Sequence, residues 1–166
     1  MSAYRVAILT LSDKGAVGQR VDESGPALKA MVEAAGLVAP IMAILPDERA
    51  LLEARLREIC DAGQADLVLT TGGTGLSPRD QTPEATLAVA ERLVPGLGEV
   101  MRAESLKKTS RAMLSRGVAV IRKKTLIVNL PGSVKGAREN LAAILPALGH
   151  GLDILTGAGG ECGQTQ

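Results

Sequence analysis

The alternation of short apolar runs with helix-forming segments is the feature that most constrains the fold. The apolar runs are rich in branched residues, which is typical of strands buried on both faces of a sheet. They span residues 4–11, 37–45, 66–71, 117–121 and 125–130. Segments of helical composition span residues 27–35, 48–60, 82–94, 97–108, 110–114 and 133–155. This order predicts one three-layer, doubly wound α/β domain with a mostly parallel sheet. The domain is expected over residues 1–156, with a flexible glycine-rich tail over residues 157–166.

Composition argues against several classes of function. The 166 residues suffice for one sizeable core, which must be aliphatic because aromatic residues make up only 1% of the chain. Tyr4 is the sole aromatic residue, so no platform for stacking bases exists and no nucleic-acid partner is expected. Cys60 and Cys162 lack the spacing of a metal site or a disulfide framework. With no signal segment and no apolar run of membrane-spanning length, we expect a cytoplasmic protein without a membrane partner.

A glycine loop follows the apolar run that ends at residue 71. Its residues are Thr71, Gly72, Gly73, Thr74 and Gly75. Closely spaced glycines allow positive φ angles and let several backbone N–H groups converge, which is how proteins bind phosphate. Neither the Walker A motif nor the dinucleotide-binding glycine pattern is present. A tight strand-to-helix connection without a ligand is the alternative interpretation.

Two aspartates are candidates for the chemistry. Asp80 follows the glycine loop and Arg79, and a carboxylate beside a phosphate needs a cation between them, so a metal-bound nucleotide or another phosphorylated substrate is indicated. The alternative for Asp80 is a solvated loop acid. Asp47 comes directly after the run 37–45 and has two compatible interpretations: the N-cap of the helix 48–60, or a second acid at the carboxyl end of a strand.

Two further segments are expected at the same edge of the sheet. The polar segment 12–26 contains the site candidates Ser12, Asp13, Asp22 and Ser24, although Ser24 is better explained as a helix cap. The turn Pro131-Gly132-Ser133 ends the last apolar run. Ser133 can cap the following helix and still contact phosphate there. If this turn meets the glycine loop, the two frame a single pocket.

The remaining polar features are less specific. Thr82 is expected to cap the helical segment 82–94. His150 lies between two glycines late in the last helical segment, where a C-terminal cap explains it better than catalysis. Residues 102–138 contain ten Lys or Arg and one acid, Glu104. This basic stretch is either a solvated surface or a means of attracting an anionic substrate.

Several motifs in order resemble the molybdopterin adenylyltransferase family of molybdenum-cofactor biosynthesis. The resemblance covers nearly the whole chain and rests on residues 7–13, 24–25, 46–48, 71–75, 78–86, 112–116 and 129–133. It implies the fold of that family and the Mg²⁺-dependent transfer of AMP from ATP to the terminal phosphate of molybdopterin. A homotrimer, and a separate downstream protein that inserts molybdate, are also implied.

The resemblance also suggests roles for individual residues. Asp47 and Asp80 would be the catalytic, metal-binding acids, while residues 72–75 would contact the ligand phosphates and residues 131–133 would lie in the pocket. Arg79, Arg116 or Lys135 would offset negative charge. Two departures are Gln81, where relatives often carry Val, and Ser133, which occupies a variable position.

Two alternatives to the transferase remain. The first is a paralogue of the same fold that binds molybdopterin without transferring AMP. The second is molybdate insertion, for which the related domain normally belongs to a much longer chain.

Overall fold

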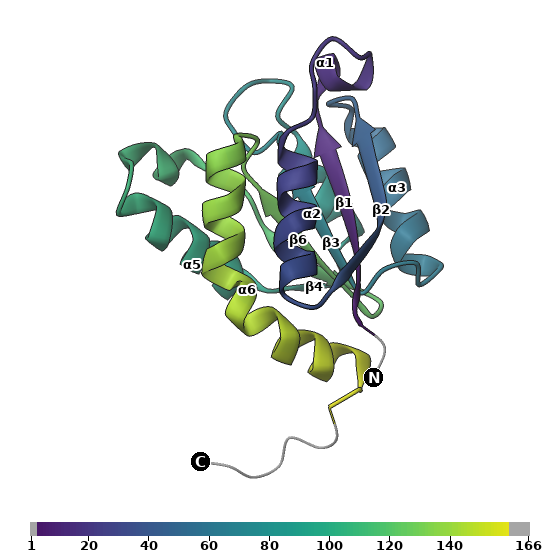
Figure 1. The fold of residues 1–166 in the computed structure, drawn as a ribbon. Helices are drawn as coiled ribbons and strands as arrows, with labels where there is room; N and C mark the ends of the chain where they lie inside the picture. Colours follow the sequence, from purple (N-terminus) through teal and green to yellow (C-terminus); the bar gives the residue numbers. More distant parts are fainter. Residues whose placement is uncertain (1–2, 160–166) are drawn as a thin grey trace.

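The computed structural model describes residues 3–159, which form a six-stranded sheet in the order β2-β1-β3-β6-β5-β4 (Figure 1). β1 pairs in parallel with β2 and β3, and β3 pairs in parallel with β6, whereas β5 is antiparallel to both β6 and β4. The strands are β1 (Arg5–Leu11), β2 (Val38–Leu45), β3 (Leu67–Thr71), β4 (Arg92–Leu93), β5 (Ala119–Arg122) and β6 (Thr125–Leu130). The prediction of a mostly parallel, doubly wound sheet is confirmed.

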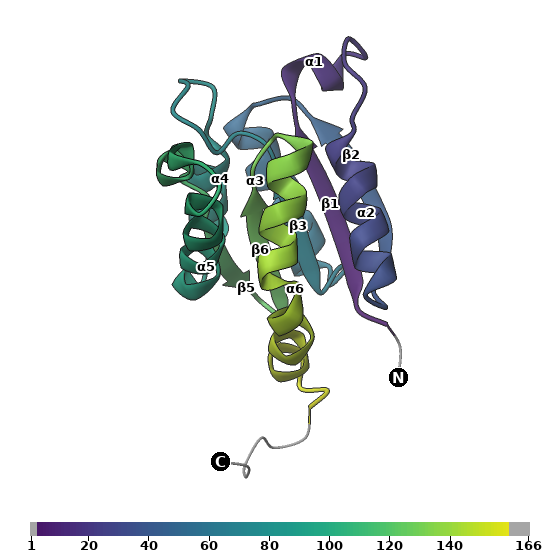
Figure 2. The ribbon, with the colours of Figure 1, turned by 60° about the vertical axis from the view of Figure 1, so that its left-hand side comes forward.

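Helices cover both faces of the sheet and create three layers (Figure 2). α2, α5 and α6 pack on one face, and α3 and α4 on the other. The helices are α1 (Asp13–Ala16), α2 (Ser24–Ala34), α3 (Arg49–Asp61), α4 (Thr82–Val89), α5 (Pro95–Leu106), the 3₁₀ helix η1 (Ser110–Leu114) and α6 (Val134–Thr156). Among residues 3–159, none of the helices combines the length and apolarity needed to cross a bilayer.

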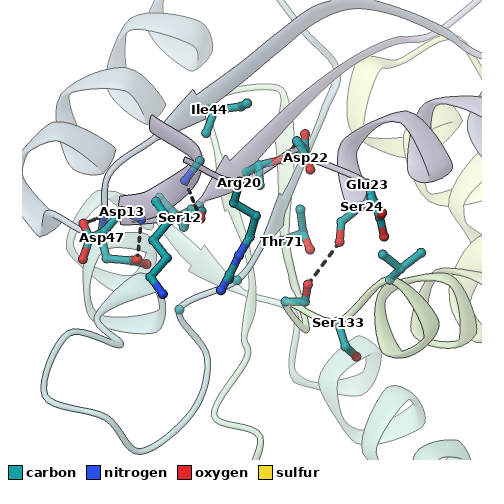
Figure 3. Close-up of a pocket in the computed structure, with 18 of the residues that line it drawn as sticks. Ser12, Asp13, Arg20, Asp22, Glu23, Ser24, Ile44, Asp47, Thr71 and Ser133 are labelled. Carbon is teal, nitrogen blue, oxygen red and sulfur yellow. Dashed lines mark hydrogen bonds between the residues drawn. The ribbon is translucent and has the colours of Figure 1, made fainter. Parts of the chain in front are cut away.

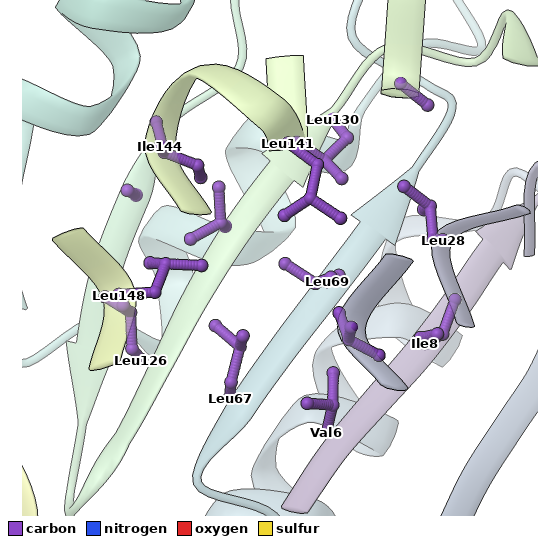
Figure 4. Close-up of a cluster of buried hydrophobic side chains, with 14 of the residues drawn as sticks. Val6, Ile8, Leu28, Leu67, Leu69, Leu126, Leu130, Leu141, Ile144 and Leu148 are labelled. Atoms are coloured by element: carbon purple, nitrogen blue, oxygen red, sulfur yellow. The ribbon is translucent and has the colours of Figure 1, made fainter. Parts of the chain in front are cut away.

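The core is aliphatic, as the composition requires. On one face, Leu141, Ile144 and Leu148 of α6 pack over the central strands beside Leu28 of α2 (Figure 4). On the other face, Leu56 of α3 belongs to a second cluster. The β1 and β3 side chains in this cluster point to the opposite side of the sheet from those in the first cluster. Both faces of the central strands are therefore buried, which holds the carboxyl ends of these strands in fixed relative positions.

The direction of the chain across the sheet reverses between β1 and β3. β2 lies on one side of β1 and β3 on the other, so the connections that leave β1 and β3 diverge. In open α/β sheets such a switch point leaves a crevice at the carboxyl ends of the strands. The predicted pocket is expected there.

Two stretches differ from the sequence predictions by more than a few residues. The helix predicted over 82–94 ends at Val89, because Ala90 is extended, and the edge strand β4 follows. A strand of two residues has no periodicity to detect. The segment 12–26, predicted as a loop, contains the one-turn helix α1 and the start of α2.

The assignment of His150 as a helix C-cap was wrong. α6 continues through it to Thr156, and the cap is Gly157 with φ +78°. Leu148 and Leu152 flank the two glycines and are 2% and 0% exposed, so burial of these side chains outweighs the poor helix propensity of glycine. Of the predicted tail, residues 160–166 lie outside the described residues.

Candidate active site

A cavity of about 760 Å³ lies at the carboxyl ends of β1, β2, β3 and β6, at the switch point (Figure 3). Asp13 and Asp47 lie next to each other on one side of it, Ser24 and Ser133 on the other, and Thr71 between them. The predicted site residues that line it are Ser12, Asp13, Asp22, Ser24, Asp47, Thr71, Gly72, Gly73, Asp80, Gly132 and Ser133. We call this cavity the carboxylate pocket.

The glycine loop and the Pro131-Gly132-Ser133 turn meet, as expected. The Gly72 N–H donates to the Leu130 carbonyl at 3.1 Å, and the Thr71 hydroxyl donates to the Pro131 carbonyl at 2.6 Å. Gly72 and Gly73 have φ angles of +105° and +68°, which residues with a Cβ rarely adopt. Glycine is therefore required where the two loops join.

Thr82 binds the glycine loop through hydrogen bonds and does not cap α4. The predicted cap hydrogen bond is absent: the N-cap of α4 is Gln81, and Thr82 already lies within the helix. The buried Thr82 hydroxyl donates to the Gly72 carbonyl at 3.0 Å, and the Thr82 N–H donates to the Gly73 carbonyl at 3.1 Å. Both carbonyls are thus bound by the first residue of α4, which fixes the loop to that helix.

The N-cap interpretation of Asp47 was also wrong. Glu48 is the N-cap of α3, and its side chain makes no cap hydrogen bond with the described residues. Instead, Asp47 and Asp13 bind each other reciprocally. The Asp13 N–H donates to Asp47 Oδ2 at 3.1 Å, and the Asp47 N–H donates to Asp13 Oδ1 at 2.9 Å. Burial raises the pKa of Asp47, and the nearby carboxylates of Asp13 and Asp80 raise it further.

Arg79 is paired with Asp13. Its Nε and Nη2 donate to the two Asp13 carboxylate oxygens at 3.1 and 2.7 Å, and this pairing holds the pKa of Asp13 below its usual range. Arg79 does not line the carboxylate pocket but a small adjoining depression that it shares with Asp47. The predicted phosphate contact of Arg79 stays a prediction, because its Nε and Nη2 are paired with Asp13 in this structure.

Asp80 reaches the carboxylate pocket from the end of the β3–α4 connection. Its Oδ2 accepts from the Ser77 N–H at 2.9 Å, and the Asp80 N–H donates to the Ser77 carbonyl at 2.9 Å. The pKa of Asp47 responds to the Asp80 charge, so the two carboxylates repel each other.

These carboxylates fit a magnesium ion. The described residues contain no cluster of three or more His, Cys, Asp or Glu side chains that could enclose a metal. Mg²⁺ prefers one or two carboxylates, with water and substrate phosphates as its other ligands. Asp47 and Asp80 match that donor set, and a cation would relieve the repulsion that raises the pKa of Asp47.

Ser24 is not the predicted cap: the N-cap of α2 is Glu23, which makes no side-chain cap hydrogen bond, and Asp22 binds the first turn instead. Asp22 Oδ1 accepts from the Gly25 N–H at 3.0 Å, and Oδ2 accepts from the Thr10 hydroxyl at 2.9 Å. Ser24 lies within α2, and its hydroxyl donates to the Gly132 carbonyl at 3.1 Å. Ser24 therefore ties α2 to the Pro131-Gly132-Ser133 turn. The cap expected of Ser133 is present, with Oγ accepting from the Gly136 N–H at 3.1 Å.

A second cavity of about 580 Å³ lies on the other side of the glycine loop, and we call it the α5–α6 pocket. Thr74, Gly75 and Pro131 line it, so these predicted residues face away from the carboxylate pocket. Ser133 lines both cavities. The other lining residues are Leu76, Arg102, Ser105, Thr109, Arg111, Ala112, Leu114, Ser115, Gly136, Glu139 and Asn140.

Sequence reasoning did not single out every polar residue of the carboxylate pocket. Arg20 and Glu23 line it, as does Lys14 of α1, for which no role had been inferred. The only available signal was that all three lie in the polar segment after β1, at the edge where ligands collect.

Together, the switch-point crevice, the glycine loop and the neighbouring carboxylates define an α/β protein with a polar ligand-binding cavity at the carboxyl edge of its sheet. The comparisons with known proteins narrow this class. Residues 7–150 match the family described as "Probable molybdopterin binding domain", and the chain belongs to that family.

Similar proteins extend over nearly the whole chain. The molybdopterin adenylyltransferase of Helicobacter pylori (strain J99) is 44% identical over 160 residues, covering 95% of this chain and 90% of that protein. The molybdopterin adenylyltransferase of Escherichia coli (strain K12) is 44% identical over 153 residues, covering 90% and 78%. The crystal structure of the molybdopterin biosynthesis enzyme MoaB from Thermus thermophilus has a TM-score of 0.88 and 50% identity, covering 93% and 97%.

Proposed function

We propose that this chain is a molybdopterin adenylyltransferase, which transfers AMP from Mg-ATP to the terminal phosphate of molybdopterin. The observation that carries the proposal is the convergence of the glycine loop with Asp47 and Asp80 at one cavity, in a member of the molybdopterin-binding family. The relatives named above carry the same activity in their names. The products are adenylyl-molybdopterin and pyrophosphate.

Of the two cavities, the carboxylate pocket is the better site for the triphosphate of ATP. Asp47 and Asp80 would hold Mg²⁺, which when bound neutralises charge on the triphosphate. The Gly72 N–H is taken by the Leu130 carbonyl, so the phosphate site of the loop would be built at Gly73, where Lys14 and Arg20 add positive charge at the same cavity. Ser133 caps the N-terminus of α6 and lines both cavities, and anions are favoured at a helix N-terminus.

The α5–α6 pocket suits the pterin. A fused polar heterocycle needs apolar surface and a few hydrogen-bonding groups, and Leu76 and Leu114 lie in this cavity beside Arg102 and Asn140. Ser133 and the glycine loop lie between the two cavities. With ATP in one cavity and molybdopterin in the other, the phosphates of both would lie at this boundary. The reacting groups would then meet there.

In this reaction an oxygen of the molybdopterin phosphate attacks the α-phosphorus of ATP. A new P–O–P bond forms, the bond from the α-phosphorus to the β-bridging oxygen breaks, and its electrons leave with pyrophosphate. The nucleophile is the substrate's own phosphate, so the protein contributes by positioning and charge neutralisation. None of the described residues that line the carboxylate pocket is Cys or His, in keeping with this assignment.

The test is incubation with molybdopterin, ATP and magnesium while pyrophosphate is measured. Pyrophosphate above a control without pterin is expected. Asp80→Asn should abolish turnover and leave the circular-dichroism spectrum unchanged, because an amide cannot replace a carboxylate as a magnesium ligand. A near-normal rate in this variant would refute the role of Asp80.

Titration calorimetry separates the transferase from a paralogue that only binds molybdopterin. The transferase should bind ATP with a magnesium-dependent affinity as well as pterin. Binding of pterin alone, with no pyrophosphate formed, would identify the non-catalytic paralogue instead.

We further propose that the protein is a cytoplasmic homotrimer that passes its product to a separate molybdate-inserting protein. Leu106, Met113 and Leu114 near the α5–η1 junction are 46%, 64% and 50% exposed, and an apolar surface of this kind supports self-association. Light scattering coupled to size-exclusion chromatography should give three times the monomer mass. A monomeric mass would rule out the trimer without affecting the transferase proposal.

A further inference from the structure

Arg116 makes more contacts with the β3–α4 connection than any charge-neutralising role requires. It follows η1, and its backbone N–H donates to the Thr74 carbonyl at 3.0 Å. Its Nε donates to the Gly75 carbonyl at 2.8 Å, and its Nη2 donates to the Asp80 carbonyl at 2.6 Å. Its Nη1 forms an ion pair with Glu84 in the first turn of α4. One guanidinium therefore joins the start of the connection, its end and the helix beyond it.

These contacts commit the Arg116 guanidinium to acceptors of the protein itself. All three nitrogens donate to protein oxygens on Gly75, Asp80 and Glu84. Arg116 is not among the residues that line either the carboxylate pocket or the α5–α6 pocket. The structure thus gives no support to the expectation that Arg116 offsets phosphate charge.

The contacts control where the Asp80 carboxylate lies. A Cβ on Gly75 would stand 2.9 Å from Asp80 Oδ2, so the two sides of the connection approach closely. The planar, rigid guanidinium of Arg116 binds the Gly75 carbonyl and the Asp80 carbonyl, and so fixes the distance between them. The Asp80 carboxylate is then directed by its bond from the Ser77 N–H, within the segment that Arg116 encloses.

Glu84 anchors this guanidinium to a rigid element. It precedes Ala85 in α4, and Ala85 is fully buried in the core. Glu84 Oε1 pairs with Arg116, while Oε2 is buried and has no hydrogen-bond partner among the described residues. The Arg116 guanidinium is therefore tied to the packed helix α4 as well as to the connection before it.

We propose that Arg116, anchored by Glu84, is a positioning residue that sets the Asp80 carboxylate in its metal-binding orientation. This inference rests on the function proposed above. Arg116 acts through the directions of its three N–H bonds, so a positive charge alone at the same position does not replace it.

Arg116→Lys tests geometry against charge. Lysine keeps the charge, but its donors radiate from one nitrogen and cannot span three separated acceptors. We expect kcat to fall about 10²-fold, as a misplacement of roughly 1 Å can cause. The magnesium concentration for half-maximal rate should rise, and KM for ATP at saturating magnesium should stay unchanged. A lysine variant with normal kcat, or one with only a raised KM for ATP, would overturn the proposal.

Arg122→Lys is the matched control. Arg122 also forms a forked ion pair, with Asp61 at 2.9 and 2.8 Å, and donates to the Val89 carbonyl at 3.2 Å. It ends β5, which runs antiparallel to β6, so it lies at the edge of the sheet opposite the site. This variant should lose stability and keep the wild-type magnesium dependence. A magnesium shift equal to that of Arg116→Lys would show that the effect is merely general loosening, and would overturn the proposal.

Because Arg116→Lys can leave Glu84 poorly paired and unfold the chain, a double variant, Arg116→Gln with Glu84→Gln, removes both charges together. The double variant should show the same magnesium shift as Arg116→Lys, and a wild-type magnesium dependence in a folded double variant would contradict the proposal.

Hydrogen–deuterium exchange without ligand gives a readout that does not depend on turnover. The amides of Ser77, Arg79 and Asp80 should exchange faster in both Arg116 variants than in Arg122→Lys. If exchange in the Arg116 variants equals that in Arg122→Lys, the positioning role is refuted. If exchange is faster but the wild-type protein forms no pyrophosphate, only the transferase function is refuted.

Discussion

Gly72 offers a quantitative test of how the glycine loop is built. A Cβ at this position would lie 2.5 Å from the Leu11 carbonyl oxygen, and the residue has φ +105°. Gly36, at the end of α2, has φ +87° but no atom within 4 Å of the added Cβ. Comparing Gly72→Ala with Gly36→Ala therefore separates the cost of the positive φ angle from the cost of the clash.

The expected magnitudes follow from these two terms. Both variants should lose about 1–2 kcal/mol of unfolding free energy, because an L-residue is disfavoured at positive φ. Gly72→Ala should lose roughly 1–3 kcal/mol more, the usual cost of overpacking, since the clashing atom belongs to the backbone of a buried strand. At about 2–4 °C per kcal/mol for a chain of this size, its melting temperature should fall by roughly 4–20 °C.

Urea unfolding followed by circular dichroism measures both free energies, and differential scanning calorimetry measures both melting temperatures. The substrate-binding consequence is separate: at a temperature where Gly72→Ala is folded, it should bind Mg-ATP more weakly than Gly36→Ala. Equal destabilisation of the two variants would refute the claim that Gly72 is wedged against Leu11.

Three further predictions concern stability and reactivity. Asn129→Ala should lose about 1–3 kcal/mol in urea unfolding, because the buried Asn129 amide donates to the Thr70 and Thr86 hydroxyls; a loss below about 0.5 kcal/mol would contradict that view. The Arg116 guanidinium lowers the pKa of Glu84, so the stability advantage of wild type over Glu84→Gln should be complete above the ordinary pKa of glutamate and vanish as the pH falls through the lowered value. An advantage that grows on acidification would refute this coupling. Burial raises the pKa of Cys60 to about 11, so iodoacetamide at pH 8 should label the Cys60 peptide in mass spectrometry only after urea is added.

The succession of the longer strands along the chain, and the sheet edge at which the candidate site residues gather, could be predicted from the sequence. Buried parallel strands have continuous apolar runs, and their carboxyl ends are the usual place for ligands. Glycine density located the loop at residues 72–75, and its meeting with Pro131-Gly132-Ser133 was anticipated. These signals are local, so one sequence suffices to read them.

The contacts that organise the site could not be predicted, because they join side chains distant in sequence. The Asp13–Asp47 pairing spans 34 positions and the Arg116–Gly75 contact 41. Neither depends on periodicity. Thr82 and Ser24 were misassigned as caps because a hydroxyl before a helix has the same sequence signature whether it caps or bonds to a neighbouring loop.

The destination of the α-phosphate of ATP tests the central claim most directly. The protein would be incubated with molybdopterin, Mg²⁺ and ATP carrying radiolabel at either the α- or the γ-phosphate, followed by separation of the pterin product from pyrophosphate. We expect the α-label to appear on the pterin and the γ-label in pyrophosphate. A γ-label on the pterin, or an absence of label on the pterin with both substrates bound, would contradict the assignment as an adenylyltransferase.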